Sequence, residues 1–396
     1  MEKRKVQYRF YEEEQIKPVY ARLNDKESFK TYAGLRKKLV EYNLNIPIRA
    51  FHGASVLEFG PSTGDNSLIF AHWGAELTLV EPVEAFIENI DDYFKKNGLT
   101  GALSRVECNT FEKYETQDKF DFVVAEGFVF HTGLPDYWLP RLGSFIKKNG
   151  FLLFSHLETT GYLIELLHAK CLQYFQINHH EDPLVLSRKM FLKKWRKVNH
   201  SRNFDAWAYD NLIYPTLNAY LLNSIVDFQD IMGESGLLLW SSWPSVTHYR
   251  DVSWIKKQAI DKGEVIARNR NNFFRLLPSM VIGRQIDVTD QIDKVAESLF
   301  SALCSEVEAL AIPIPSLDSK KINEIRQGHK KIDELFQVCV RDYNASCLMK
   351  LWQEIDQCLE YLANGDMDGI IHLFNSNGPL ANDWGSPNFY SVWHSA

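Results

Sequence analysis

The sequence predicts an α/β protein in which a parallel sheet is covered by helices on both faces and followed by a mainly helical extension. With 396 residues the chain exceeds the ~250–300 residues that one hydrophobic core usually supports, so we expect two domains or a large insertion. Apolar runs alternate with helical stretches between residues 55 and 155, as in parallel strands joined by crossover helices. Beyond residue 157 the periodicity is mostly helical.

The elements are expected in a regular order. Two helices open the chain, and Asn24 and Asp25 are cap candidates for the second. In the first 155 residues we expect helices 11–23 and 28–42, strand 55–59, helix 66–73, strand 76–80, helix 83–97, strands 104–107 and 120–125, helix 137–148 and strand 151–155. After residue 157 we expect helices 162–175 and 217–232, strand 236–241, helices 287–309, 320–341 and 345–364, and a returning strand at 388–393.

These elements suggest four regions along the chain. They are an N-terminal helical cap (1–49), a core with a helical insertion (50–244), a mainly helical extension or lid (245–385) and a final core strand (386–396). A ligand is expected at the carboxyl ends of the parallel strands, where such sheets form a crevice.

Composition and charge exclude several classes of protein. The chain is 45% hydrophobic and 24% charged, which excludes a disordered chain. A net charge of −7 without a basic cluster argues against nucleic acid as a partner. No apolar stretch is long enough to span a membrane, and the six scattered cysteines contain no C-x-x-C pair, so we expect a cytoplasmic protein with reduced thiols.

The most informative segment runs from Val56 to Asn66. It reads as a strand with an acidic residue near its end, a loop containing Gly60 and Gly64, and the start of a helix. Glycines let the backbone turn tightly and approach a ligand, and the helix N-terminus offers free amide donors. The spacing does not fit the G-x-G-x-x-G of nicotinamide-binding Rossmann domains. It fits E/D-x-G-x-G-x-G.

On these residues the chain resembles the class I S-adenosylmethionine-dependent methyltransferases. Glu58, Gly60 and Gly64 match the first motif of that family, and Ser62 occupies the place of its middle glycine. The resemblance implies a Rossmann-like core with a mostly parallel seven-stranded sheet. It also implies S-adenosyl-L-methionine as the cofactor.

Further matches follow in the family's order up to about residue 156. Glu81 matches the acidic residue that binds the cofactor ribose, and Asn109 stands where the family has an aspartate near the adenine. Residues 120–124 (FDFVV) match the fourth-strand pattern F-D-x-V, and residues 150–154 (GFLLF) match the fifth strand. The resemblance implies these cofactor-binding residues: Glu58, Gly60, Pro61, Ser62, Gly64, Glu81, Pro82, Asn109, Thr110 and Glu126.

A looser resemblance covers residues 200–275 and the extreme C-terminus. Short matches such as 207–210 (WAYD) and 242–244 (SWP) are similar to a bacterial group of these methyltransferases that occurs with surface-polysaccharide or small-molecule pathways. These matches are too short to identify a substrate.

Three residues are candidates for a general base. Methyl transfer to a hydroxyl or an ammonium requires loss of a proton, and a base near the fourth or fifth strand end would accept it. Glu126 follows the fourth strand, His131 comes five residues later, and His156 follows the fifth strand. Each also has an alternative role: Glu126 in contacting the cofactor, His131 in capping a helix, and His156 in packing.

Other groups have stronger structural than functional interpretations. The aromatic residues Tyr11, Tyr20, Phe128 and Phe130 could cover the sulfonium, but ordinary packing is favoured. Residues 179–182 (HHED) form a solvated loop rather than a metal site, because adjacent histidines point apart. The basic runs 193–197 and 329–331 are expected on the surface, the first with recognition of an acidic acceptor group as its functional alternative.

The leading hypothesis is S-adenosylmethionine-dependent methyl transfer to an O or N atom of a small-molecule acceptor such as a sugar, a nucleotide-sugar or a secondary metabolite. A protein or peptide methyltransferase is one alternative. A catalytically silent module that binds the cofactor and docks a partner through the extension is another. No metal, nucleic acid or membrane partner is expected, and a homodimer is left open.

Overall fold

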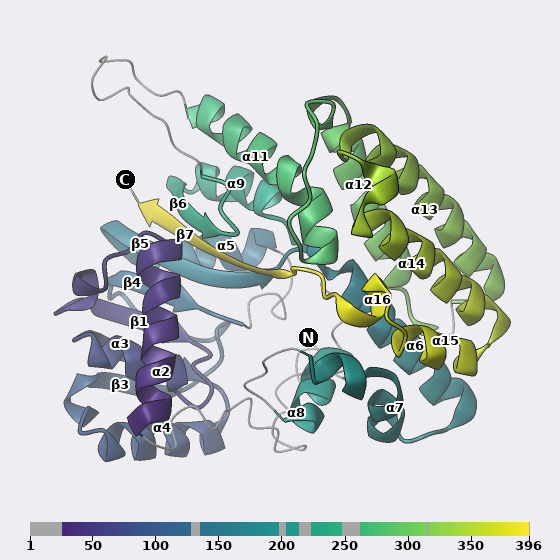
Figure 1. Ribbon diagram of the computed structural model, residues 1–396. Helices are drawn as coiled ribbons and strands as arrows, with labels where there is room; N and C mark the ends of the chain where they lie inside the picture. The colour runs from purple at the N-terminus through teal and green to yellow at the C-terminus, as the bar shows by residue number, and fades with distance from the viewer. Residues whose placement is uncertain are drawn as a thin grey trace. The chain divides into compact units, whose positions relative to one another are not determined.

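The computed structural model describes residues 26–127, 135–197, 203–213, 223–247, 262–314 and 317–395 (Figure 1). The chain divides into two compact units, which are described separately. The first comprises Met1–His156, Ile225–Thr247 and Phe389–Ala396, and the second comprises Leu157–Ser224 and His248–Asn388. Residues 157–224 therefore group with the later helices, whereas the sequence suggested an insertion in the core.

The first unit contains a seven-stranded sheet in the order β3-β2-β1-β4-β5-β7-β6. Its strands are β1 (Ser55–Phe59), β2 (Glu76–Glu81), β3 (Leu103–Cys108), β4 (Phe120–Ala125), β5 (Ile146–Leu157), β6 (Leu237–Trp243) and β7 (Asn388–Ser395). The pairs from β3 through β5 are parallel, and β6 pairs with β7 in antiparallel fashion. This arrangement confirms the predicted fold class, including the late strand and the returning C-terminal strand.

Helices pack on both faces of this sheet. The helical segments of the first unit are α2 (Lys26–Lys37), the π-helical turn η2 (Lys38–Asn43), the 3₁₀ turns η3 (Ile48–Phe51) and η4 (Thr100–Ala102), α3 (Asp65–His72), α4 (Glu84–Lys96), α5 (Pro135–Gly143) and α9 (Ile225–Glu234). Successive strand residues point to opposite faces, so each strand contributes to two apolar layers. On one face Phe51 stacks between Phe70 and Phe122, with ring centroids 5.1 and 4.3 Å apart.

The other face is built around Phe154 of β5. Its ring lies 5.3 Å from Trp138 of α5, 5.7 Å from Phe228 of α9 and 6.3 Å from Trp393 of β7. Trp138, Phe154 and Phe228 are completely buried, and Trp393 is almost completely buried. These aromatic contacts tie elements from three distant parts of the sequence into one layer.

The predicted helix 137–148 was too long at its C-terminal end. The helix α5 ends at Gly143, and β5 begins at Ile146, where it pairs with Phe120 of β4. The backbone N–H of Phe120 donates to the carbonyl of Phe145 at 2.9 Å. Residues 146–148, which were predicted as the end of the helix, belong instead to β5 because they lie where β5 pairs with β4. Their local sequence is compatible with either helix or strand.

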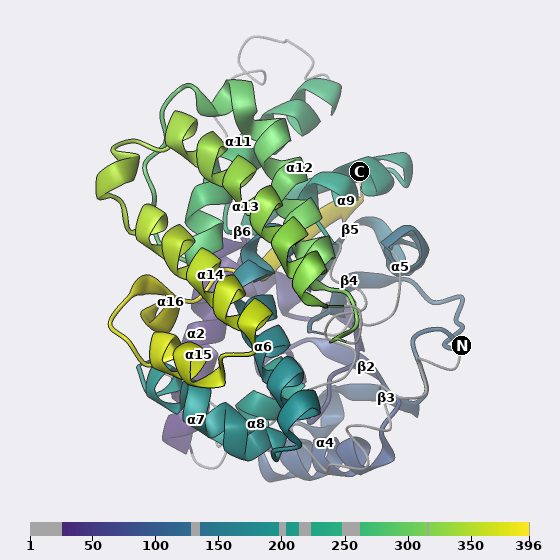
Figure 2. The ribbon, with the colours of Figure 1, turned by 90° about the vertical axis from the view of Figure 1, so that its right-hand side faces the viewer.

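The second unit is helical. Its helices are α6 (Leu163–His179), α7 (Pro183–Trp195), α8 (Phe204–Ala208), α11 (Lys262–Ile282), α12 (Ile292–Leu310), α13 (Ser319–Cys339), α14 (Cys347–Asn364), α15 (Met367–Phe374) and α16 (Pro379–Asn382), with the short turns η6 (Thr159–Tyr162), η7 (Tyr209–Ile213) and η9 (Tyr343–Ala345). Figures 1 and 2 show α12, α13 and α14 side by side. The sequence indicated these three helices but not α7 or α11, whose apolar stripes are interrupted by lysines and arginines.

Residues 193–197 were predicted as a solvated helix face; Lys193, Arg196 and Lys197 are exposed, but Lys194 is buried. It is 1% exposed, donates to the carbonyl of Leu380 at 2.9 Å and lies 4.1 Å from the centroid of the Trp384 ring. Burial lowers the pKa of Lys194 to about 7, although the nearby carboxyl of Glu165 opposes the change. The lysine connects α7 to the segment that begins at Pro379.

The acidic residues of the 179–182 segment have structural partners. Asp182 caps α7 by accepting hydrogen bonds from the backbone N–H groups of Leu184 and Val185, both at 2.9 Å. Glu181 pairs with Lys189 at 2.7 Å. Both carboxylates therefore stabilise the start of α7.

Among the described residues, no helix combines the length and the apolar character that crossing a membrane requires.

Gly283 provides a test of packing in the second unit. A Cβ at this position would lie 2.0 Å from the carbonyl oxygen of Trp384, and its φ is +68°. We expect Gly283→Ala to destabilise the protein by about 4 kcal/mol or more, because backbone strain and overlap with a backbone atom add together. Gly365→Ala is the matched control, since Gly365 has a φ of +67° and open space around it. It should cost only about 1–2 kcal/mol. Denaturant unfolding of both variants measures the difference, and equal losses would contradict the packing argument.

Candidate functional site

The loop between β1 and α3 has an unusual backbone. Gly60, Ser62 and Gly64 all have positive φ values, of 63°, 54° and 83°. A Cβ on Gly64 would lie 2.9 Å from Cγ1 of Ile90, so only glycine fits there without a shift. Ser62 adopts the left-handed conformation although it has a side chain. Glycine adopts this conformation without strain, which explains why the methyltransferase motif favours glycine at this position.

Glu81 holds this loop against the end of β2. Its carboxylate accepts hydrogen bonds from the backbone N–H of Ser62 at 2.8 Å and from that of Val83 at 3.0 Å. Glu81 is 3% exposed, and burial raises its pKa to about 7 although both amide donors oppose the change. The acidic strand end predicted from the sequence is therefore a buried acceptor directly beside the glycine loop.

Glu58 lies deeper, in β1. It is 2% exposed and accepts a hydrogen bond from the hydroxyl of Ser67, on α3, at 2.6 Å. Burial raises the pKa of Glu58 to about 8, and the Ser67 hydrogen bond opposes this only in part. Its hydrogen bond with Ser67 connects β1 to α3.

Glu126 is bound by an arginine from the N-terminal helix. Arg36, on α2, donates from Nη1 to Oε2 at 2.8 Å and from Nη2 to Oε1 at 2.6 Å. Both side chains are 6% exposed. Although burial opposes its charge, the Glu126 carboxylate raises the pKa of Arg36 above its ordinary value. The pair is therefore a buried, bidentate contact at the carboxyl end of β4.

Two more polar side chains, Tyr32 and Asn66, join the Arg36–Glu126 pair. We call these four residues the Glu126 cluster. Asn66, in the first turn of α3, donates to Glu126 at 3.4 Å and accepts a hydrogen bond from the hydroxyl of Tyr32. Tyr32 and Arg36 are one helical turn apart on α2, so they face the same side. The cluster joins α2, α3 and β4 next to the glycine loop.

Asn109 and Thr110 follow β3 and lie beside Glu81. The backbone N–H of Asn109 donates to the carbonyl of Glu81 at 3.2 Å. The side-chain oxygen of Asn109 accepts from the backbone N–H of Thr110 at 2.9 Å. Pro82 lies between Glu81 and Val83, and the carbonyl of Pro61 closes the glycine loop by accepting from Gly64 at 2.9 Å. The predicted cofactor residues are therefore gathered at the ends of β1, β2, β3 and β4.

His156 is not brought to this cluster. Successive residues of a strand point to opposite faces of the sheet. Ser155 faces the segment that follows β4, and its hydroxyl accepts a hydrogen bond from the backbone N–H of Gly127 at 2.9 Å. His156 points the other way and is 1% exposed, with ring centroids 4.6 Å from Phe228 and 5.3 Å from Phe389. Its surroundings are the aromatic layer of the opposite face of the sheet.

Several predicted residues fall outside the described part of the chain. They are Tyr11, Tyr20, Phe128, Phe130 and His131. The structure therefore tests neither the candidate base His131 nor the choice between packing and sulfonium contact for these aromatic residues.

The aspartate of the F-D-x-V pattern has a structural role. Asp121 accepts hydrogen bonds from the backbone N–H of Ser55 at 2.9 Å and from the ammonium of Lys147 at 2.9 Å. These contacts join the starts of β1, β4 and β5, at the opposite end of the strands from Glu81 and Glu126. Although partial burial opposes it, the hydrogen bond from Lys147 keeps the pKa of Asp121 below its ordinary value.

Sequence reasoning missed Arg36 and Tyr32. The helix that carries them was predicted, and their i, i+4 spacing indicates a shared face, but nothing in the local sequence shows that this face meets Glu126. A charged residue one turn from a tyrosine is ordinary on a solvated helix. Only the tertiary contact with Glu126 shows that Arg36 is buried rather than solvated.

The comparisons with known proteins agree with the motif. Residues 26–210 match the family described as a methyltransferase domain. No curated protein sequence matches the chain. The structure of PKMT2 from Rickettsia typhi in complex with AdoHcy is 18% identical, with 58% of this chain and 48% of that chain covered and a TM-score of 0.37.

Two other solved structures show the same low level of similarity. The CcbJ methyltransferase from Streptomyces caelestis is 18% identical over 28% of this chain and 45% of that chain, with a TM-score of 0.25. Coclaurine N-methyltransferase, bound to N-methylheliamine and SAH, is 11% identical over 93% of this chain and 72% of that chain, with a TM-score of 0.37. The chain spans about half the length of the first solved structures it matches.

The family match at residues 26–210, the glycine-loop motif and the order of the strands agree with one another. Residues 26–210 thus contain a methyltransferase domain, and its glycine loop and strand order are those of the class I, S-adenosyl-L-methionine-dependent type.

Proposed function

We propose that this protein transfers the methyl group of S-adenosyl-L-methionine to an O or N atom of a small-molecule acceptor. The observation that carries this proposal is the Glu126 cluster, a buried polar group next to the glycine loop and covered by α2. Tyr32 is 7% exposed and Arg36 is 5% exposed, so α2 closes this part of the first unit. A closed polar surface suits a sugar, a nucleotide-sugar or a secondary metabolite better than a protein chain.

The residues around the glycine loop fit the cofactor. The carboxyl group of Glu81 would accept hydrogen bonds from the ribose hydroxyls, and Asn109 would lie toward the adenine. The hydroxyl oxygen of Ser62 is buried without a hydrogen-bond partner among the described residues, so a polar ligand would satisfy it. When bound, the cofactor supplies a methyl group on a positively charged sulfur.

The chain's own contribution is mainly positioning. Holding the acceptor in line with the methyl group can supply several kcal/mol, and exclusion of water strengthens the polar contacts. Both oxygens of Glu126 are engaged by Arg36, which favours a positioning role for Glu126 over proton transfer. The proposal places the protein in small-molecule biosynthesis in the cytoplasm, and the acidic composition and free cysteines support it.

Glu81 allows a test of the cofactor site. We expect Glu81→Ala to weaken S-adenosylmethionine binding by about 100-fold or more, because a buried acceptor of two hydroxyl donors is lost. In the wild type, hydroxyl donors favour the ionised carboxylate. Since the pKa of Glu81 is raised to about 7, affinity should rise with pH toward neutrality and level off above it. Calorimetric titration across this range measures both effects.

The control for this pH dependence is Glu81→Gln, which keeps the size of the side chain but cannot titrate. Its affinity should be lower and should no longer rise through neutral pH. Glu58→Gln separates the contribution of the other titrating carboxyl group, whose pKa is raised to about 8. An unchanged pH slope in Glu81→Gln would contradict the role of Glu81.

The candidate bases are separated by the pH profile of turnover. We expect Glu126→Gln to lower turnover by about 10–100-fold without changing the shape of the profile, because positioning is lost and no titrating base is removed. His156→Phe keeps an aromatic ring in the Phe228 layer and should leave turnover within about threefold of wild type. Loss of one limb of the profile in either variant would identify that residue as the base.

The acceptor class is tested with isotope-labelled cofactor and a panel of sugars, nucleotide-sugars, aromatic metabolites and peptides. Mass spectrometry should show label on a small molecule, and Glu81→Ala should remove that product. Label only on peptides would favour a protein methyltransferase. Cofactor binding without any product would favour the silent module.

A further inference from the structure

A cavity of about 270 Å³ lies between α12 and α13 in the helical unit. Small side chains keep the two helices from filling it, among them Ala302, Ser305 and Ala309 on α12. A carboxylate, Glu306, also lines it and is 3% exposed. A buried carboxylate at a cavity wall is a costly arrangement unless a partner satisfies it.

Glu306 faces a histidine on its inner side. Oε1 of Glu306 lies 3.7 Å from Nδ1 of His329, and burial raises the pKa of Glu306 although His329 opposes this. Nε2 of His329 lies 2.9 Å from the carbonyl oxygen of Trp352. Because a carbonyl only accepts, Nε2 carries a hydrogen. One oxygen of Glu306 is thus directed at the histidine.

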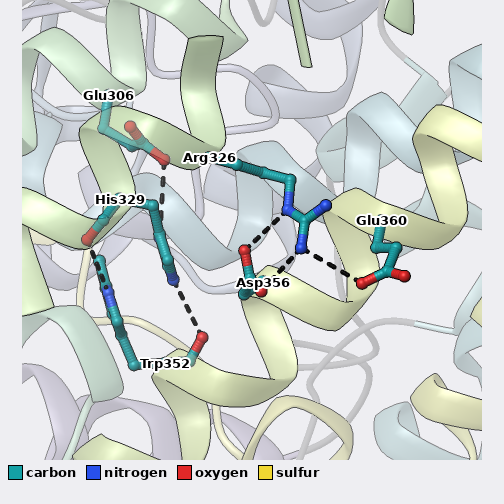
Figure 3. Close-up of polar contacts among 6 residues, drawn as sticks. All are labelled: Glu306, Arg326, His329, Trp352, Asp356 and Glu360. Atoms are coloured by element: carbon teal, nitrogen blue, oxygen red, sulfur yellow. Dashed lines mark hydrogen bonds and ion pairs between the residues drawn. The ribbon is translucent and has the colours of Figure 1, made fainter. Parts of the chain in front are cut away.

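Of residues 329–331, which were expected on the surface, Lys330 and Lys331 are exposed, but His329 is buried. His329 is 3% exposed and stacks on Trp352, with ring centroids 4.0 Å apart. On the same helix Arg326 binds both oxygens of Asp356, at 2.8 and 3.0 Å, and contacts Glu360 at 3.2 Å. Figure 3 shows that these contacts join α13 to α14. The cavity wall is therefore preorganised.

Gly328 leaves the other oxygen of Glu306 accessible. A Cβ on Gly328 would lie 3.0 Å from Oε2 of Glu306 and would crowd it. Gly328 lies inside the 21-residue helix α13, where glycine is destabilising relative to alanine. The absence of a side chain at Gly328 leaves space in front of the carboxylate that fits a hydrogen-bond donor.

The rim of the cavity carries a cation with no carboxylate partner. Lys321 pairs with Glu324 at 3.2 Å, so their charges offset one another. Lys331 also lines the cavity, and within the described part of the chain it forms no ion pair. The cavity therefore presents a buried anion at its wall and an unpaired cation at its edge.

We propose that this cavity binds a small zwitterion, whose ammonium group donates to Glu306 and whose acidic group reaches Lys331. A simple cation would leave Lys331 without a partner and would be repelled by it, and a simple anion would face Glu306. None of the residues that line the cavity belongs to the glycine loop.

The test uses matched probes of increasing length: glycine, β-alanine and γ-aminobutyrate, with butylamine and butyrate as single-charge controls. We expect one zwitterion to bind the full-length protein with a Kd of about 1 mM, as suits so few atoms. Both single-charge probes should bind at least about tenfold more weakly. Calorimetry measures the affinities, and histidine ¹⁵N spectra should show a shift at His329 with the zwitterion.

Gly328→Ala is the decisive variant, because alanine should maintain or raise the stability of α13 while it crowds Glu306. It should abolish binding at an unchanged or higher melting temperature. Glu306→Gln should weaken binding at least about tenfold, and Lys331→Ala about fivefold. Lys330→Ala, at a neighbouring exposed lysine outside the cavity lining, should bind like wild type. Absence of binding by every probe, equal binding of butylamine, or binding that persists in Gly328→Ala would overturn the proposal.

Discussion

The contact between the Glu81 carboxylate and the amide of Ser62 is the interaction on which the candidate site depends. It fastens a loop with three left-handed residues to the end of the neighbouring strand, and Gly60 adds a second tie by donating to the carbonyl of Val80 at 2.9 Å. A loop of such backbone would otherwise sample many conformations. Because the strands are parallel, the same edge of the sheet also receives Asn109 and Glu126. The cofactor residues therefore meet through strand order.

Desolvated charge is a recurring feature of both units. The Glu126 carboxylate is satisfied by Arg36, and Lys194 by a carbonyl and an aromatic face. Removing one member of a buried ion pair such as Arg36–Glu126 typically costs about 3–5 kcal/mol, because the other charge is left without a partner. In both cases the partner comes from a distant part of the sequence. Each contact thus fixes how one helix packs within its own unit.

The two units bury their carboxyl groups in different ways. In the first unit Glu58 and Glu81 have raised pKa values because burial outweighs their hydrogen bonds, so both change charge near neutral pH. In the helical unit burial also raises the pKa of Glu306, but the group that opposes the change is a histidine that stacks on Trp352. A titrating group beside a ligand site makes affinity depend on pH. The glycine loop and the α12–α13 cavity share this property.

The sequence by itself determined the α/β class, the order of the strands along the chain and the acidic and glycine positions at the cofactor loop. These features are local: periodicity distinguishes strand from helix, and left-handed turns need glycine. Tertiary structure alone decided that Arg36 meets Glu126, that Lys194 and His329 are buried, and that His156 belongs to an aromatic layer. The same residue types are common on solvated surfaces, and only packing across long sequence separations sets their environment. The end of α5 was likewise decided by pairing with β4, since the local sequence allowed either state.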